Sequence, residues 1–523
     1  MQHKKIPLAD TKAFSPFFLD YIDQKAPIKP FYNRFPLLEN FKDQIGEKSK
    51  SFPSHNREVL VSTFQKQYQH LKTPELVSGN ISALADPKTF TVTTGHQLNI
   101  FTGPLYVIFK IVTVINACKK LKATYPDFHF VPVYWMASED HDYDEIKYFD
   151  LYGKKYVWET SQKGAVGRFS TKGLEKLLQE IPGDAEIFKE AYTKNKILSD
   201  AVRHYVNALF GNEGVVVLDA DDRDLKSLFK PVMEEDLFKH TTIKLVNETN
   251  KGLADPGYKT QVFCRDINFF YLDKNIRERI EKRDDRYFVL ETQLSFSEDE
   301  LRKMIEQEPE KLSPNVILRP LYQEIILPNL AYVGGPAENT YWLQLKKVFD
   351  HFMIPFPMLM PRNFGVVVDH TIQRKVEKTG LDLIHFFEEK NYLYNHWVLK
   401  NSGKDLTVGA ERTTIMEIYE QLKRRAESID KTLGPFTAAE GTRVMNGLEK
   451  IERKLLRAEK RLHTDKLRQI DAVKNALFPN GILQERVDNF LNFYQRDKQF
   501  IAKLISCFDA FDYKFNVLIY TGA

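Results

Sequence analysis

Short apolar runs alternate with helical patterns along the middle of the chain. Five of these runs are almost continuously apolar, which is typical of strands buried on both faces of a parallel sheet. They are Phe90–Thr94, Phe130–Ala137, Gly214–Asp219, Leu330–Val333 and Pro355–Met360. Helical patterns follow at Pro104–Leu121, Arg223–Phe238 and Glu338–His351. This alternation predicts a doubly wound α/β core with a parallel sheet.

The spacing of the runs predicts how this core is divided. Residues 1–88 are expected to be mainly helical and to pack on a core at 89–375. The long intervals between runs leave room for insertions at about 150–210 and 240–315. Within the second insertion, the segments YKTQVFC, NFFYLD and RYFVLE each predict a short strand.

The carboxyl-terminal third shows a different pattern of apolar residues. Apolar residues from Ile415 to Leu433 and from Val444 to Leu462 follow heptad spacing, with Leu433-Gly434-Pro435 as the expected turn between them. This predicts an antiparallel coiled-coil hairpin in a helical domain at 376–490. Its charged residues favour a solvated face over a polyanion site. Residues 491–523 are expected to return to the core as a helix and a half-buried strand.

Composition narrows the class of protein. The 523 residues are 43% hydrophobic and carry a net charge of only +4, which excludes wholesale disorder and disfavours nucleic-acid binding. No apolar stretch is long enough for a membrane span or resembles a secretory leader. Three scattered cysteines exclude a disulfide framework and a cysteine-based zinc site, and Cys118 is expected in the core. We therefore expect a cytoplasmic protein without nucleic-acid or membrane partners.

The residues that follow the strands are the first candidates for a site, because open α/β sheets bind ligands beyond the carboxyl ends of their strands. After the first run come Thr94-Gly95-His96-Gln97 and Thr102-Gly103-Pro104, then Tyr106 and Lys110 four residues apart. Free amides at this helix start can hold a phosphate or carboxylate. The alternative is a turn that needs glycine only for its geometry.

An acidic segment follows the second run. Ser138-Glu139-Asp140-His141-Asp142-Tyr143-Asp144-Glu145 holds five carboxylates and a histidine directly after an apolar strand. Such a cluster can bind a metal, hold an amine or hydroxyl group, or act as a general base. Without a second histidine at ligand spacing, an amine or hydroxyl site is favoured over a metal. The alternative is a solvated loop that begins a helix.

Three further segments add candidates. Asp219-Ala220-Asp221-Asp222 can bind a ribose or cap a helix. Gly334-Gly335-Pro336, followed by Glu338, again offers backbone amides at a helix start. Arg319 lies among apolar residues, where a charge needs an anionic partner, and Arg362 follows the last strand toward the same edge.

Taken together, these strings resemble the bacillithiol-biosynthesis cysteine-adding family, BshC. The resemblance is carried by TGHQ and FTGPLYVIFK, by PVYWMASEDHDYDEI, by LSPNVILRPLYQEIILPNLAYVGGPAE and by FPNGILQER, and it covers essentially the whole chain. It implies a Rossmann-like core, similar to class I nucleotidyltransferases, with connecting-peptide insertions and a coiled coil that forms a homodimer. The family often has Gln at the position of His96. Tyr106 and Phe109 stand where nucleotidyltransferases carry a histidine pair that binds ATP phosphates.

The resemblance also implies an activity, the condensation of L-cysteine with glucosaminyl-malate in the last step of bacillithiol synthesis. The cysteine carboxyl must be activated, as an acyl-adenylate or acyl-phosphate, with ATP and Mg²⁺ as the expected cofactors. Glu139, Asp140, His141 or Asp142 would then position the amine and take its proton. The glycine segments would hold phosphate or carboxylate oxygens, and Arg319 or Arg362 the malyl carboxylates.

Two other hypotheses stay open at this point. The acidic segment is compatible with a metal-dependent hydrolase. Alternatively, the coiled coil would make the protein a dimeric scaffold whose α/β core binds a ligand without converting it.

Overall fold

The five apolar runs form one parallel sheet in the computed structural model, which describes residues 1–520. The strands are β2 (Thr89–His96), β3 (His129–Met136), β6 (Val216–Asp219), β12 (Asn329–Gly334) and β13 (Met358–Pro361). They lie in the order β13-β12-β2-β3-β6. The chain first adds β3 and β6 on one side of β2 and then β12 and β13 on the other side, so the strand order reverses between the neighbours β2 and β12. This is the strand order of a Rossmann-like sheet, and the reversal marks the expected ligand crevice.

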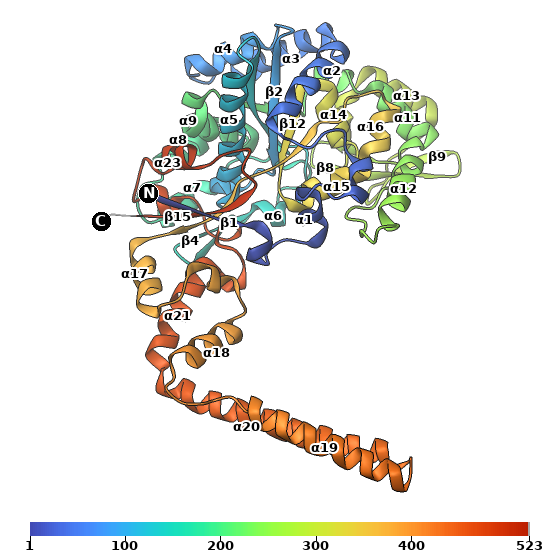
Figure 1. Ribbon diagram of the computed structural model, residues 1–523. Helices are drawn as coiled ribbons and strands as arrows, with labels where there is room; N and C mark the ends of the chain where they lie inside the picture. The colour runs from blue at the N-terminus through green and yellow to red at the C-terminus, as the bar shows by residue number, and fades with distance from the viewer. Residues whose placement is uncertain (521–523) are drawn as a thin grey trace.

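Alternate residues of the strands pack on opposite layers of helices. Phe90 and Phe130 share an apolar cluster with α2 (Phe41–Ser51) and α5 (Tyr106–Thr124). Val131 and Val133 belong to the larger cluster on the other face, with side chains of α3 (Ser54–Tyr68). Burial on both faces explains why these strands are continuously apolar. The predicted α/β core is therefore confirmed (Figure 1).

Two of the predicted helices are interrupted. Residues 223–238 form α10 (Arg223–Ser227) and α11 (Lys230–Lys239), because the ring of Pro231 is incompatible with a helix that continues from the preceding turn. Residues 338–351 lie in α15 (Pro336–Trp342) and α16 (Lys346–His351), joined by a 3₁₀ turn.

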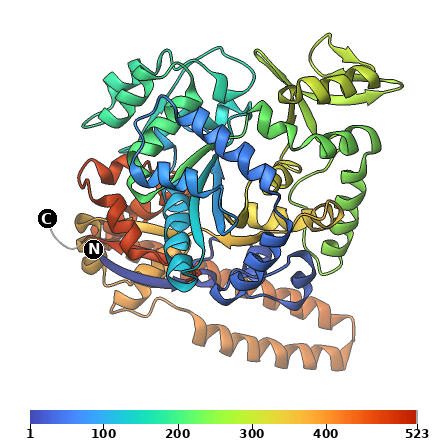
Figure 2. The same ribbon diagram turned by 90° about the horizontal axis from the view of Figure 1, so that it is seen from above.

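The second insertion carries an antiparallel sheet at one corner of the molecule (Figure 2). Its order is β10-β9-β8-β7-β11, with β7 (Phe269–Asp273), β8 (Ile276–Arg283) and β9 (Arg286–Val289) at its centre. The short flanking strands are β10 (Ser295–Phe296) and β11 (Leu312–Pro314). The strand expected at 258–264 is absent, because Gln344 Oε1 accepts the N–H groups of Gln261 and Val262 at 2.8 and 3.1 Å in place of a strand partner.

The first insertion combines a hairpin with helices. Strands β4 (Tyr148–Leu151) and β5 (Lys154–Val157) precede three helices. These are α7 (Leu174–Glu180), α8 (Glu186–Lys194) and α9 (Leu198–Phe210).

The coiled-coil hairpin is also confirmed. Helices α19 (Gly409–Ile429) and α20 (Leu433–Leu462) pack along each other and project from the rest of the molecule (Figure 1). The turn falls at residues 430–432, where Asp430 accepts hydrogen bonds from the amide and hydroxyl of Thr432. Gly434 and Pro435 therefore lie in the first turn of α20, where proline is tolerated.

A three-stranded sheet joins the helical domain to the core. The tail strand β15 (Lys514–Ile519) lies between β1 (Gln2–Pro7), to which it is antiparallel, and β14 (Phe364–Val368), to which it is parallel. Helices α17 (His370–Thr379), α18 (Lys390–Asn401) and α21 (Thr464–Leu477) pack against this sheet. No helix within residues 1–520 is long and apolar enough to cross a bilayer.

An ion pair with almost no solvent access fixes this junction. Arg362 donates two hydrogen bonds to the carboxylate of Glu485, at 2.5 and 3.0 Å, and the two side chains are 2% and 1% exposed. Glu485 also accepts the amide of Gly365, and Gln484 bonds both backbone groups of Val367. The side chains of Gln484 and Glu485 thus supply hydrogen-bond partners for backbone groups on the edge of β14 that does not pair with β15.

We predict that Glu485→Gln strongly destabilises the protein, because it leaves the Arg362 guanidinium buried without its counter-charge. Removing one partner of a buried pair costs about 3–5 kcal/mol. Glu298→Gln is the matched control, since it breaks an exposed pair with Arg302 and should cost under ~1 kcal/mol. Thermal melting of both variants checks this, and equal melting temperatures would contradict it.

Candidate functional site

A cavity of about 580 Å³ opens at the carboxyl edge of the sheet, across the reversal between β2 and β12. Its floor comes from residues at the ends of β2 and β3, one wall comes from β12 and α15, and the opposite wall comes from the second insertion. Its lining includes Gly95, His96, Gln97, Trp135, Glu139, Asp140, His141, Phe263, Arg265, Phe270, Arg277, Arg279, Val316, Arg319, Tyr332 and Glu338. The site therefore lies where the sheet topology predicts it.

Glu338 ties the two strands at the reversal together. Its carboxylate accepts hydrogen bonds from the Tyr332 hydroxyl at 2.6 Å and the Gly335 amide at 2.8 Å, and it pairs with Lys110 Nζ at 2.6 Å. Lys110 also donates to the carbonyl of Gly95 at 2.9 Å. Burial acts to raise the pKa of Glu338, but Lys110 and the other donors outweigh burial and lower it to about 2. Glu338 therefore stays ionised and structural.

His96 stands beside this pair at the floor of the cavity. Its Nε2 lies 3.2 Å from the hydroxyl of Tyr106. Burial, together with the nearby Lys110 ammonium, lowers the pKa of His96 to about 3. The imidazole is thus neutral at pH 7, and it contributes a hydrogen-bonding group rather than a charge.

The amides of Gly335 and Gly103 are already engaged within the chain. The amide of Gly335 is bonded to Glu338, and Gly334 is packed against Asn339. Thr102 and Gly103 form a buried turn, which Asn489 holds through the carbonyls of Phe101 and Gly103 at 2.7 and 2.6 Å. The amides of Gly335 and Gly103 are therefore not available to a phosphate in this structure, and a phosphate role for Thr94-Gly95-His96-Gln97 stays a prediction.

Two further predicted residues also lie away from the cavity. The Thr94 hydroxyl donates to the carbonyl of Val333 at 2.7 Å and so joins β2 to β12. Arg362 is bound to Glu485, with the ring of Tyr106 5.1 Å from its guanidinium. Because its charge is already neutralised, Arg362 is not a free partner for a substrate carboxylate.

The acidic segment divides into two parts. Glu139, Asp140 and His141 line the cavity, whereas Asp142 does not. Asp142 is exposed and caps the short helix α6 (Tyr143–Ile146), where it accepts the amide of Glu145 at 3.3 Å. For Asp142, the alternative of a solvated helix start is therefore the correct one.

Asp140 is held at the cavity wall by several donors. It accepts hydrogen bonds from Gln97 Nε2 at 2.9 Å and from the amide of His141 at 2.7 Å, and Arg277 Nη1 lies 3.7 Å away. Burial acts to raise the pKa of Asp140, but Arg277 and these donors outweigh burial and lower it below its ordinary value. Asp140 is thus a fixed negative charge near neutral pH.

His141 is held by the same arginine. Arg277 Nη1 lies 2.5 Å from Nδ1 of His141, and the ring packs against Phe270 with centroids 5.5 Å apart. Burial and the Arg277 charge lower the pKa of His141 below its ordinary value. Because the guanidinium donates to Nδ1, the neutral ring carries its proton on Nε2 and acts as a donor.

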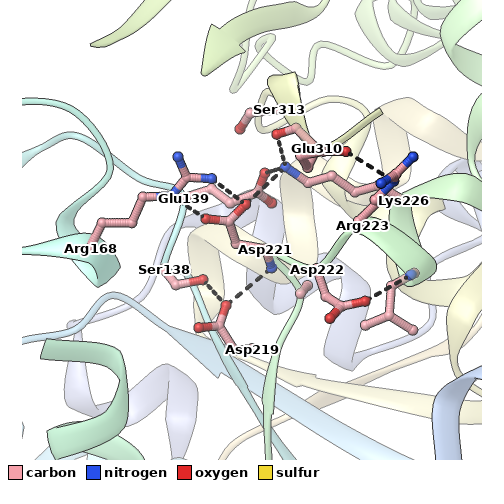
Figure 3. Close-up of polar contacts among 12 residues, drawn as sticks. Ser138, Glu139, Arg168, Asp219, Asp221, Asp222, Arg223, Lys226, Glu310 and Ser313 are labelled. Atoms are coloured by element: carbon pink, nitrogen blue, oxygen red, sulfur yellow. Dashed lines mark hydrogen bonds and ion pairs between the residues drawn. The ribbon is translucent and has the colours of Figure 1, made fainter. Parts of the chain in front are cut away.

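Glu139 belongs to a buried charge network that continues behind the cavity (Figure 3). Lys226 Nζ lies 2.5 Å from Glu139 and 3.2 Å from Asp221, and Asp221 pairs with Arg168 at 2.8 Å. Burial raises the pKa of Glu139 above its ordinary value, although Lys226 acts in the opposite direction. Asp222 caps α10, so of the two roles open for it the structure supports capping.

Arg319 reaches the cavity without a counter-charge. Its guanidinium lies 5.4–5.7 Å from the rings of Trp135, Tyr332 and Trp342, and its Nη1 donates to Gln323. Nη2 is buried and makes no hydrogen bond, and within residues 1–520 no carboxylate lies within ion-pair distance of this side chain. A buried, unpaired guanidinium beside a cavity is suited to bind an anion.

Sequence reasoning missed the wall that the second insertion supplies. Strand alternation in IRERIEKR does place Arg277 and Arg279 on one face. Nothing local to the segment shows that this face covers a cavity formed by distant strands. Among the residues that the structure describes, no three His, Cys, Asp or Glu side chains are grouped to hold a metal ion.

The strand order and the cavity at the carboxyl edge of the sheet define a Rossmann-like domain. The projecting helical hairpin defines a second, coiled-coil domain. Residues 1–363 match the family description "Bacillithiol biosynthesis BshC, N-terminal Rossmann-like domain". Residues 365–520 match "Bacillithiol biosynthesis BshC, C-terminal coiled-coil domain". The chain belongs to the BshC family of bacillithiol biosynthesis.

Relatives of similar length share this architecture. The chain is 42% identical over 516 residues to a protein of Flavobacterium johnsoniae, with 97% of each chain covered. It is 40% identical over 517 residues to a protein of Cytophaga hutchinsonii, with 99% of each covered, and 30% identical over 514 residues to one of Salinibacter ruber, with 94% of each covered. All three are described as "Putative cysteine ligase BshC".

We predict that His96 makes stability depend on pH. The folded protein binds the His96 proton only near pH 3, whereas the unfolded chain binds it near 6.5. Between these values the unfolded state holds more protons, so acidification favours unfolding. On going from pH 7 to pH 5, wild type should lose ~2 kcal/mol more unfolding free energy than His96→Gln. Urea titrations at both pH values check this, and parallel losses would contradict it.

Proposed function

We propose that the protein joins the carboxyl group of L-cysteine to the amine of glucosaminyl-malate, as the last step of bacillithiol biosynthesis. One observation carries the proposal: a single cavity presents the unpaired guanidinium of Arg319 and the carboxylates of Glu139 and Asp140. An amide-forming site needs both kinds of group, because it must hold a carboxylate and an amine side by side. The description of the relatives as cysteine ligases supports the same chemistry.

The acidic residues would serve the amine. Asp140 is fixed by Gln97 and Arg277, so it is suited to orient the sugar amine. Glu139 has a raised pKa and is therefore the better proton acceptor of the two. As the C–N bond forms, the amine nitrogen would give a proton to Glu139 and the carboxyl C–O bond would break, so that the oxygen leaves on the phosphate or AMP of the activating co-reactant.

Arg319 would hold the carboxyl group that reacts. The resemblance implied that Arg319 or Arg362 binds the malyl carboxylates, but the Arg319 guanidinium is buried among three aromatic rings at the end of the strands. This depth favours the small cysteine carboxylate. Loss of the carboxyl oxygen requires an activating co-reactant, for which we propose ATP with Mg²⁺. The amides of Gly103 and Gly335 already have partners within the chain, so other groups would have to hold the nucleotide phosphates.

The ligation itself is tested with purified protein. We predict that cysteine, glucosaminyl-malate and ATP yield the thiol product, detected by mass, and that omission of ATP abolishes it. In cells that lack the protein, glucosaminyl-malate should accumulate and the thiol should disappear. Ligand binding without turnover would instead support the dimeric scaffold, and normal bacillithiol in a clean deletion strain would refute the proposal.

Variants of the acidic segment connect this activity to the cavity. Asp140→Asn and Glu139→Gln keep the shape but remove a charge, and each should lower the rate by about 10²–10⁴-fold. Asp142→Asn is the matched control, because Asp142 caps α6 outside the cavity and should leave turnover nearly unchanged. His96→Gln should also be mild, since the family often has Gln there. Folded Asp140 and Glu139 variants with wild-type rates would exclude this role.

We also propose that the hairpin forms a homodimer. Its outer side carries an apolar stripe in which Ile451, Leu455 and Leu462 are 51%, 39% and 69% exposed, continued on α19 by Ile418 and Leu422. Exposed apolar side chains along both helices of a projecting hairpin indicate an interface, and a two-fold axis would pair this surface with itself.

We predict that Leu455→Gln weakens the dimer while the hairpin stays helical, because Leu455 faces outward. Arg457→Gln, two residues along and on a different side of α20, should leave the dimer intact. Light scattering across a dilution series checks the mass, with circular dichroism for helix content. A Leu455→Gln protein with the wild-type dimer population would contradict the prediction.

A further inference from the structure

The wall that the second insertion contributes to the cavity is rich in arginine. Strands β7 and β8 pair antiparallel, with Phe270 opposite Arg279, so these side chains share one face of the sheet. Arg277, two residues from Arg279, lies on the same face, and its guanidinium covers the ring of Phe270 at 4.0 Å. Arg265 joins them from the loop that precedes β7.

These arginines differ in their charge partners. Arg277 is buried and is committed to Asp140 and His141. Arg265 is exposed and Arg279 half-buried, and within residues 1–520 no carboxylate lies within ion-pair distance of either. The mouth of the cavity therefore holds two guanidinium groups whose charge the protein itself does not neutralise.

Apolar side chains at the mouth of the cavity are also exposed to solvent. Phe263 is 83% exposed and Val316 is 44% exposed, and both line the cavity with the two arginines. The backbone beside Phe263 is anchored, because Gln344 accepts the amides of Gln261 and Val262. An anchored segment that presents a bare aromatic ring at a cavity mouth is typical of a ligand-contact surface.

We propose that Arg265 and Arg279 form a subsite that binds the two carboxylates at the malyl end of the acceptor. The inference rests on the proposed function, in which the acceptor amine lies at Glu139 and Asp140, deeper in the cavity. The opposite end of the acceptor then extends toward the insertion wall. Two carboxylates match two unpaired guanidinium groups, each of which can bind a carboxylate through two parallel hydrogen bonds. A nucleotide polyphosphate shares this anionic chemistry, so the experiment separates the two.

Steady-state kinetics of the full chain test the subsite. Arg265→Gln and Arg279→Gln should each raise KM for glucosaminyl-malate about tenfold or more, with kcat, KM for cysteine and KM for ATP nearly unchanged. The KM of Arg279→Lys for glucosaminyl-malate should lie between those of wild type and Arg279→Gln, because lysine keeps the charge but cannot make the two parallel hydrogen bonds of a guanidinium. Arg283→Gln is the matched control, since Arg283 lies on the same strand outside the cavity and pairs with Glu281. With methyl glucosaminide, which lacks carboxylates, all variants should behave like wild type.

A binding measurement separates this inference from the ligase proposal. L-malate, titrated calorimetrically, should bind wild type and the Arg283→Gln control but bind both cavity-mouth variants about tenfold more weakly or worse. That result without any ligation would refute the ligase and leave the subsite standing. A rise in KM for ATP instead of the acceptor would assign the arginines to phosphate. Unchanged malate affinity in folded variants, or no malate binding by wild type, would overturn the subsite.

Discussion

The Glu338 carboxylate is the constraint on which the geometry of the cavity depends. It lies half-buried at the point where the sheet reverses direction, and it binds one donor from each side of that point, the ammonium of Lys110 and the amide of Gly335. Through Lys110 it also fixes the carbonyl of Gly95. The same carboxylate occupies the helix start that would otherwise attract an anion. The start of α15 is therefore already occupied by an anionic group of the chain itself.

Buried and half-buried charges in this protein fall into two groups with different consequences. Glu338, Lys226 and Arg362 are paired within the chain, and they hold strand ends and domains in place. Arg319 and Arg279 face the cavity without such partners. An unpaired charge in a partly buried position costs free energy unless something binds it. The division between paired and unpaired groups thus separates scaffold from ligand surface more clearly than residue type does.

The parts of this arrangement that depend on local pattern were predictable from sequence. Continuous apolar runs identified the five core strands, because burial on both faces imposes that pattern directly. Heptad spacing identified the hairpin, although Ile451, Leu455 and Leu462 of the predicted stripe are exposed rather than packed between its helices. The strand-end rule placed His96 and Asp140 at the cavity. Contacts between distant parts of the chain were not predictable, because the Glu485 carboxylate that neutralises Arg362 lies over a hundred residues away in the sequence. Strand β1 was missed because its polar, mostly exposed sequence QHKKIP carries no strand period.

The sheet of β1, β15 and β14 has a consequence for how the chain is made. Its middle strand is β15, and the hydrogen-bonded pair His3 and Asn516 is separated by 513 positions. Ribosomes add ~5–20 residues per second, so β1 waits roughly half a minute or longer for its partner to be synthesised. During that interval both β1 and β14 have open edges, which are templates for wrong pairing. The two lysines of β1 are charged residues of the kind that discourage wrong pairing at an exposed strand edge, so the nascent chain is protected by groups that the native strand retains.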